Sequence, residues 1–283
     1  MTGCRRRSGF QLIDVVLAIG IMGMLASLIL PALHKARESS SRLACQDHLK
    51  QIALAVHSHH EAWGRMPPYA SGRNGDLFGG WFVHLMPFLG HEDLYAALRS
   101  SDFSSSKGVK LTGFSLWNPK LTDSIFPMLL CPSDPTWRAT QTPATTNYLA
   151  NWFAFGDGTG GAYTPPQRFR DLLDGLSNIV LFGEGYSICD SLPRLAMVPP
   201  HYHNFGVTQQ GKASDDSFYE PDDYTMFQVK PDKCDKWRAQ TPHEAMNIAL
   251  ADGTIRNVSA NISSATWKNA LKPRDGEVLG SDW

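Results

Sequence analysis

An apolar run close to the amino terminus constrains this chain more than any other feature. Residues 12–30 contain a single charged side chain, Asp14. A helix of about 20 residues crosses a bilayer core, so this length predicts a membrane-spanning helix. Three arginines at residues 5–7 precede the run and should remain cytoplasmic. A secretory signal peptide would have a shorter apolar stretch, and a buried core helix rarely follows a basic cluster at the chain start.

Asp14 is the informative residue of this run. A carboxylate inside an apolar membrane helix costs about 2.5–3.5 kcal/mol on insertion scales, so it should have a partner. No other side chain of residues 10–33 is cationic. The partner of Asp14 is therefore expected to be a group other than a side chain of residues 10–33.

The segment RRRSGFQLIDVVLAIGIMGMLASLILPAL resembles the cleavage and methylation motif of type IV prepilins and pseudopilins. The resemblance implies that a prepilin peptidase cuts after Gly9 and that Phe10 becomes a methylated amino terminus. Asp14 would then occupy the acidic fifth position of the mature chain, where Glu is usual. Gln11 stands where Thr is usual.

The same resemblance implies an organisation and a location. Residues 1–9 would be the leader, residues 10–33 the transmembrane and assembly helix, and residues 34–283 an extracytoplasmic head, with the helix continuing to about residue 63. The expected partners are the prepilin peptidase, which also methylates, other pilin-like subunits or further copies of this chain, and membrane lipid. The chain would cross the inner membrane once, and it could join a periplasmic or surface filament.

The sequence pattern predicts an α+β fold with a mainly antiparallel β head and short helices, and the resemblance implies that this fold is pilin-like. Lys and Arg number 26 against 27 Asp and Glu, which argues against a nucleic-acid partner. Residues 177–185 are typical of a central strand. Residues 246–258 predict a hairpin with a type I′ turn at Asp252 and Gly253. Residues 263–271 predict a helix that begins at a serine.

Much of the head is similar to a large bacterial family of unknown function. That family pairs a prepilin-type amino terminus with a carboxy-terminal motif of His, nine residues and Asp-Gly. The motif falls on His243, Asp252 and Gly253, with eight residues between the histidine and the aspartate. Further matching stretches are LACQDHLKQIALAVHSHHEAWGRMPP, GGWFVHLMPFL, LLCPSDP, TNYLANWF, DGLSNIVLFGEG and DGEVLGSDW.

Five cysteines are present, and removal of the leader would remove Cys4. The four that remain allow three disulfide connectivities, in a compartment that favours disulfides. Cys45 and Cys131 both lie in stretches that match the family, whereas Cys189 and Cys234 both lie in the part that does not. The resemblance therefore predicts the pairs Cys45–Cys131 and Cys189–Cys234.

Candidate chemistry in the head is sparse. His57 and His60 lie three residues apart on a predicted helix, but two histidines are half a zinc site. His243 and Asp252 could be a base and its orienting carboxylate, although the turn explains Asp252 better. No catalytic motif is present, so we expect no enzyme, metal or cofactor. The leading hypothesis is a pseudopilin-like structural protein. The alternative is an extracellular ligand-binding module tethered by one helix.

Processing is the first testable prediction. Mass spectrometry of the protein from native membranes should find a methylated amino terminus at Phe10. Replacing Gly9 with valine should block the cut, because the larger side chain crowds the scissile bond. An intact Met1, or a chain that begins near Ala44, would contradict the prediction.

Overall fold

The computed structural model describes ten stretches of the chain: residues 12–71, 79–99, 102–104, 110–112, 124–137, 144–156, 166–189, 192–196, 226–235 and 239–283. The predicted leader, the cleavage residues Gly9 and Phe10, and Cys4 lie outside these residues.

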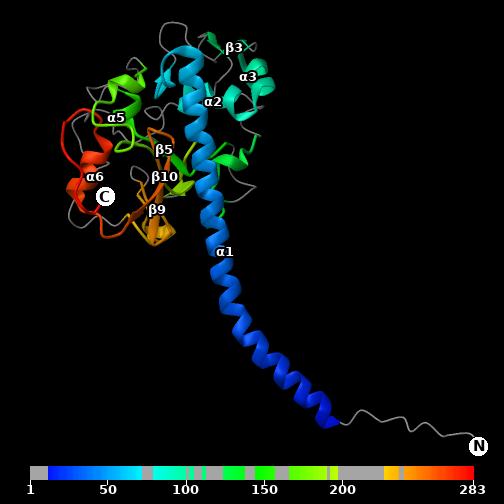
Figure 1. Ribbon diagram of the computed structural model, residues 1–283. Coiled ribbons are helices and arrows are strands. Elements are labelled where there is room, and N and C mark those ends of the chain that lie inside the picture. The colour runs from blue at the N-terminus through cyan, green and yellow to red at the C-terminus, as the bar shows by residue number, and fades with distance from the viewer. Residues whose placement is uncertain are drawn as a thin grey trace, which may run out of the picture.

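A single helix, α1, runs from Leu12 to Trp63 and ends at the residue that the sequence predicted. Gly64 follows, and its backbone N–H donates to the carbonyl of His60. The first half of α1 projects from the head, and the second half lies against it (Figure 1). Among the described residues, no helix is long and apolar enough to cross a membrane, so the span predicted over residues 10–33 stays a prediction.

The head is built on a four-stranded antiparallel sheet with the order β10-β9-β6-β5. Its strands are β5 (Tyr148–Ala150), β6 (Val180–Glu184), β9 (Ala245–Leu250) and β10 (Ile255–Ser259). In the part of the chain that the structure describes, three two-stranded ribbons accompany it: β1 (Ala70–Ser71) with β2 (Gly79–Gly80), β3 (Asp102–Ser104) with β4 (Lys110–Thr112), and β7 (Ile188–Cys189) with β8 (Leu192–Pro193).

Short helices surround the sheet. The α-helices are α2 (Trp81–Leu85), α3 (Glu92–Arg99), α5 (Trp152–Phe155) and α6 (Ser264–Leu271). The 3-10 helices are η1 (Met86–Leu89), η2 (Pro127–Leu129), η3 (Phe169–Asp171) and η5 (Pro231–Lys233). The predicted mixed fold, with an antiparallel sheet and several short helices, is therefore confirmed.

The two faces of the sheet are covered by different helices. On one face Leu49, Ile52 and Val56 of α1 belong to the same buried cluster as Phe182 and Ala249. On the other face Ile248, Leu250 and Val258 belong to a second cluster with Trp267 and Leu271 of α6. Successive residues of β9 thus serve opposite faces, as the pleat of a strand requires.

The structure confirms several local predictions and corrects one. β6 is an inner strand, and the β9–β10 hairpin lies within residues 246–258 apart from its ends. Helix α6 follows Ser263, whose side chain accepts from the N–H of Thr266. The type I′ turn was wrong: of the two turn residues only Gly253 has a positive φ, of 82°. The N–H of Leu250 donates to the carbonyl of Thr254, which closes a three-residue loop with glycine in the left-handed position.

This turn lies against α1. Lys50 Nζ donates to the carbonyl of Gly253 at 2.7 Å. The imidazole of His57 stacks on Phe169 with ring centroids 4.4 Å apart. A Cβ added at Gly253 would lie 3.3 Å from His57 Nε2, a tight contact that would require the ring to shift. The glycine is therefore required both by its backbone conformation and by the approach of the helix.

Replacing Gly253 with alanine should destabilise the protein more than replacing Gly90. Both glycines have a similar positive φ, 82° and 78°, so each alanine should cost about 1–2 kcal/mol of backbone strain. A Cβ at Gly90 meets nothing within 4 Å, whereas one at Gly253 crowds His57. Urea unfolding of the full-length protein in detergent measures both. Equal losses would show that the turn does not contact α1 closely.

Candidate functional site

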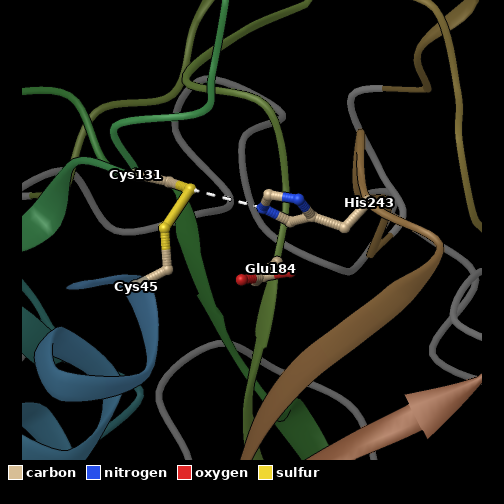
Figure 2. A group of neighbouring side chains, drawn as sticks. All are labelled: Cys45, Cys131, Glu184 and His243. Atoms are coloured by element: carbon tan, nitrogen blue, oxygen red, sulfur yellow. Dashed lines mark hydrogen bonds between the residues drawn. A yellow bond between two sulfur atoms is a disulfide. The ribbon is translucent and has the colours of Figure 1, made fainter. Parts of the chain in front are cut away.

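Polar side chains gather where α1 crosses one end of the sheet. Glu184 is the last residue of β6, and His243 lies just before β9. Because β6 and β9 are antiparallel neighbours, the end of β6 and the start of β9 lie at the same end of the sheet, and so do these two residues. Cys45 comes from α1 and Cys131 from the loop after η2. Figure 2 shows the four side chains pointing toward a common centre.

Both predicted cysteine pairs are present as disulfides. Cys45 is bonded to Cys131, 86 residues away in the chain, and Cys189 is bonded to Cys234. Cys45 and Cys131 are both buried. The first disulfide cross-links α1 to the head, and the second joins β7 to the residue that follows η5.

His243 is held between a carboxylate and a sulfur. Its side chain is 1% exposed, and its Nδ1 lies 2.5 Å from Oε1 of Glu38 on α1. An ionised carboxylate only accepts hydrogen bonds, so Nδ1 carries the proton. The opposite ring nitrogen, Nε2, lies 3.9 Å from Sγ of Cys131. Glu38 thus fixes both the tautomer and the direction of the imidazole.

Glu184 is buried and accepts three hydrogen bonds. Its Oε2 accepts from Thr241 Oγ1 at 2.8 Å and from the N–H of Asn247 at 3.1 Å, and its Oε1 accepts from Asn247 Nδ2 at 2.6 Å. Burial raises the pKa of Glu184, while hydrogen bonds from Asn247 and the nearby His243 oppose that rise. Asn247 in turn accepts from Gln46 of α1 at 3.1 Å, which connects the carboxylate to the helix.

Four of these residues together have the composition of a metal-binding site. Cys45, Cys131, Glu184 and His243 each offer one ligand atom, and all four atoms lie within 4.8 Å of one another. In the present oxidised form the two sulfur atoms are bonded to each other. Sequence reasoning named both cysteines and His243 but missed Glu184 and Glu38. The sequence did contain a signal for Glu184, because it is the one acidic residue in the mostly apolar run SNIVLFGEG.

A second polar cluster lies beside Cys131 and is centred on Asp134. Its Oδ2 accepts from Asn147 Nδ2 at 2.7 Å, and from the N–H and Oγ of Ser187 at 2.8 and 2.5 Å. Its Oδ1 accepts from the N–H and Oγ1 of Thr136 at 2.8 and 2.6 Å. Asn147 also accepts from the N–H of Cys131 at 2.9 Å. This carboxylate therefore holds three separate loops together next to the disulfide.

The structure separates the residues of the His and Asp-Gly motif. His243 precedes β9 and Asp252 follows it, so a six-residue strand of about 20 Å lies between them. Asp252 Oδ1 accepts from the N–H and Oγ1 of Thr254, which stabilises the turn. The motif residues therefore contact α1 at two distant points.

His57 and His60 lie together, as their spacing predicted. Both rings pack on Phe169, with centroids 4.4 and 4.7 Å from it. Burial lowers the pKa of His57. Within the part of the chain that the structure describes, neither histidine belongs to a group of three or more potential metal ligands.

Replacing Asp134 with asparagine should destabilise the protein by at least about 2 kcal/mol. In either orientation the new amide group faces two or three hydrogen-bond donors, and each buried donor left without an acceptor costs about 1–3 kcal/mol. Asp252→Asn is the matched control, because both of its bonds go to one oxygen that asparagine retains. That variant should stay within about 0.5 kcal/mol of wild type. Urea unfolding compares the two, and similar losses would contradict the argument.

Comparison with known proteins identifies a family that matches most of the chain. The family described as "Protein of unknown function (DUF1559)" matches residues 34–265. No curated protein matches the chain, and no solved structure matches it. The matched residues begin after the prepilin-like segment. The resemblance of that segment to prepilins therefore stays a prediction. They include both disulfides, Glu184 and the His and Asp-Gly residues, and they cover most of the chain. The chain therefore belongs to the DUF1559 family.

Proposed function

We propose that this protein is a membrane-anchored, pseudopilin-like structural subunit. The first half of α1 would assemble with similar helices, and the head would face outward. One observation carries the proposal. Every large apolar side chain that the structure describes in residues 13–33 is at least 43% exposed.

These exposed side chains do not form a single stripe. They include Ile13, Val15, Val16, Leu17, Ile19, Ile21, Met22, Met24 and Leu25, so they occupy every face of α1. A helix that is apolar on all sides is stable when lipid or other protein surrounds it. Exposed apolar surface of this extent is typical of an interaction site for membrane or protein. Helix assembly within a bilayer would cover it on all sides.

Asp14 gives the assembly a polar contact. Processing after Gly9 would free an amine at Phe10, four residues before Asp14, and residues four apart share a face of a helix. The same amine on a neighbouring helix, shifted along the axis, could pair with Asp14 instead. Charge pairing would then be coupled to association. Asp14 is shorter than the Glu that pilins use at this position, so a longer acid should pair at least as well.

Crosslinking in native membranes tests the proposal. Asp14→Asn should insert as well as wild type or better, because the cost of burying a charge falls. Its crosslinked fraction should fall, since an interhelical polar contact in a membrane contributes about 1–2 kcal/mol, or about 5- to 30-fold in association. Asp14→Glu should preserve the association or strengthen it.

Asp47→Asn is the matched control. It removes the same charge from the same helix, but Asp47 lies in the half that packs on the head, where it is exposed and accepts from Gln51. It should crosslink like wild type. Equal crosslinking of wild type and Asp14→Asn would end the assembly proposal. The protein would then be a head domain on a simple anchor.

A further inference from the structure

The Cys45–Cys131 disulfide lies against two side chains that the proposed helix assembly does not use. Glu184 and His243 complete a group of four potential ligand atoms, all buried and all within 4.8 Å of one another. The four residues come from α1, the loop after η2, the end of β6 and the segment before β9. A group built from four separate parts of the chain is a property of the fold rather than of one motif.

Two of these side chains are already oriented as metal ligands usually are. Glu38 accepts a hydrogen bond from Nδ1–H of His243, so Nε2 is the ring nitrogen left to bind a metal, and it faces the sulfur of Cys131 (Figure 2). In zinc sites, a histidine ligand usually donates a hydrogen bond from its other ring nitrogen to a carboxylate. Thr241 and Asn247 hold the Glu184 carboxylate in place. Each potential ligand outside the disulfide is therefore positioned by a neighbour.

We propose that reduction of the Cys45–Cys131 disulfide creates a closed zinc site made of Cys45 Sγ, Cys131 Sγ, His243 Nε2 and a Glu184 oxygen. The reductant is a dithiol. Its two sulfur atoms give two electrons to the protein S–S bond and become a disulfide, and its two protons pass to Cys45 and Cys131. Zn²⁺ then displaces those two protons, which leave to solvent.

The distances suit zinc. Zinc bonds of about 2.3 Å to sulfur and 2.0–2.2 Å to nitrogen or oxygen place the ligand atoms of a tetrahedron roughly 3.3–3.8 Å apart. The Cys131 Sγ to His243 Nε2 distance is 3.9 Å. Cleavage of the S–S bond frees the two sulfurs to separate to such a spacing. Thiolate and imidazole ligands favour zinc over harder cations, and four protein ligands make a structural site.

The zinc form would preserve the connection that the disulfide makes. Cys45 lies on α1, and the other three ligands lie in the head. One bound ion would therefore cross-link helix and head after the covalent bond is reduced. The two states are alternative cross-links at the same place, selected by the thiol redox conditions.

Cobalt is a visible probe for the test. The full-length protein in detergent is reduced with dithiothreitol, freed of the reductant without air and titrated with Co²⁺. We expect one Co²⁺ to bind per chain and to show both thiolate charge-transfer absorption bands and the d–d bands of tetrahedral cobalt. Addition of Zn²⁺ should displace the Co²⁺ and remove these bands. The oxidised protein should show no such bands. Glu38→Ala leaves all four ligands in place, yet it should weaken the affinity by about 10- to 100-fold, because it removes the acceptor that orients His243.

Matched variants locate the site. A Cys189→Ser and Cys234→Ser variant removes the other disulfide and should bind Co²⁺ like wild type. A Cys45→Ser and Cys131→Ser variant should lose the bands. Equal bands in that last variant would overturn the proposal. So would reduced wild type without bands, whether it stays folded by circular dichroism or unfolds, because the proposed site requires the fold.

Discussion

The packing of the second half of α1 on one face of the sheet supports the rest of the structure. Cys45, Leu49, Ile52 and Val56 follow at spacings of four, three and four residues, so they form one buried stripe. Full burial of side chains of this size contributes about 1.5–3 kcal/mol each. The facing residues Ala249 and Ala251 are small, which allows the helix to approach β9 closely. The disulfide covalently fixes the same stripe.

Buried polar groups hold the irregular parts of the head against this core. Asn151 donates to the carbonyls of Val180 and Leu271, which connects β6 to the end of α6. Asp134 and Glu184 accept hydrogen bonds that connect loops with little regular structure. Each of these groups is paired with several partners, as burial of polar atoms requires. The head depends on such networks because its strands and helices are short.

The sequence was informative where a signal was local. The hairpin of β9 and β10, the inner strand β6 and the serine before α6 each follow from neighbouring residues. The disulfide pairs followed from the family resemblance. The turn type was wrong because Asp-Gly suits several turns, and the tertiary contact of Gly253 with α1 selects among them. The group around Glu184 was missed because its members are far apart in the chain, and only the packing of α1 on the sheet brings them together.

The contacts at the two ends of β9 have a mechanical consequence. Glu38 contacts His243 before the strand, and Lys50 contacts Gly253 after it. Twelve residues of helix span about 18 Å, close to the length of the strand, so helix and strand run side by side. Tension on the projecting end of α1 therefore reaches β9 along its whole length. An inner strand loaded in that way resists by shear, with its hydrogen bonds to β6 and β10 sharing the force, whereas an edge strand would peel away one bond at a time.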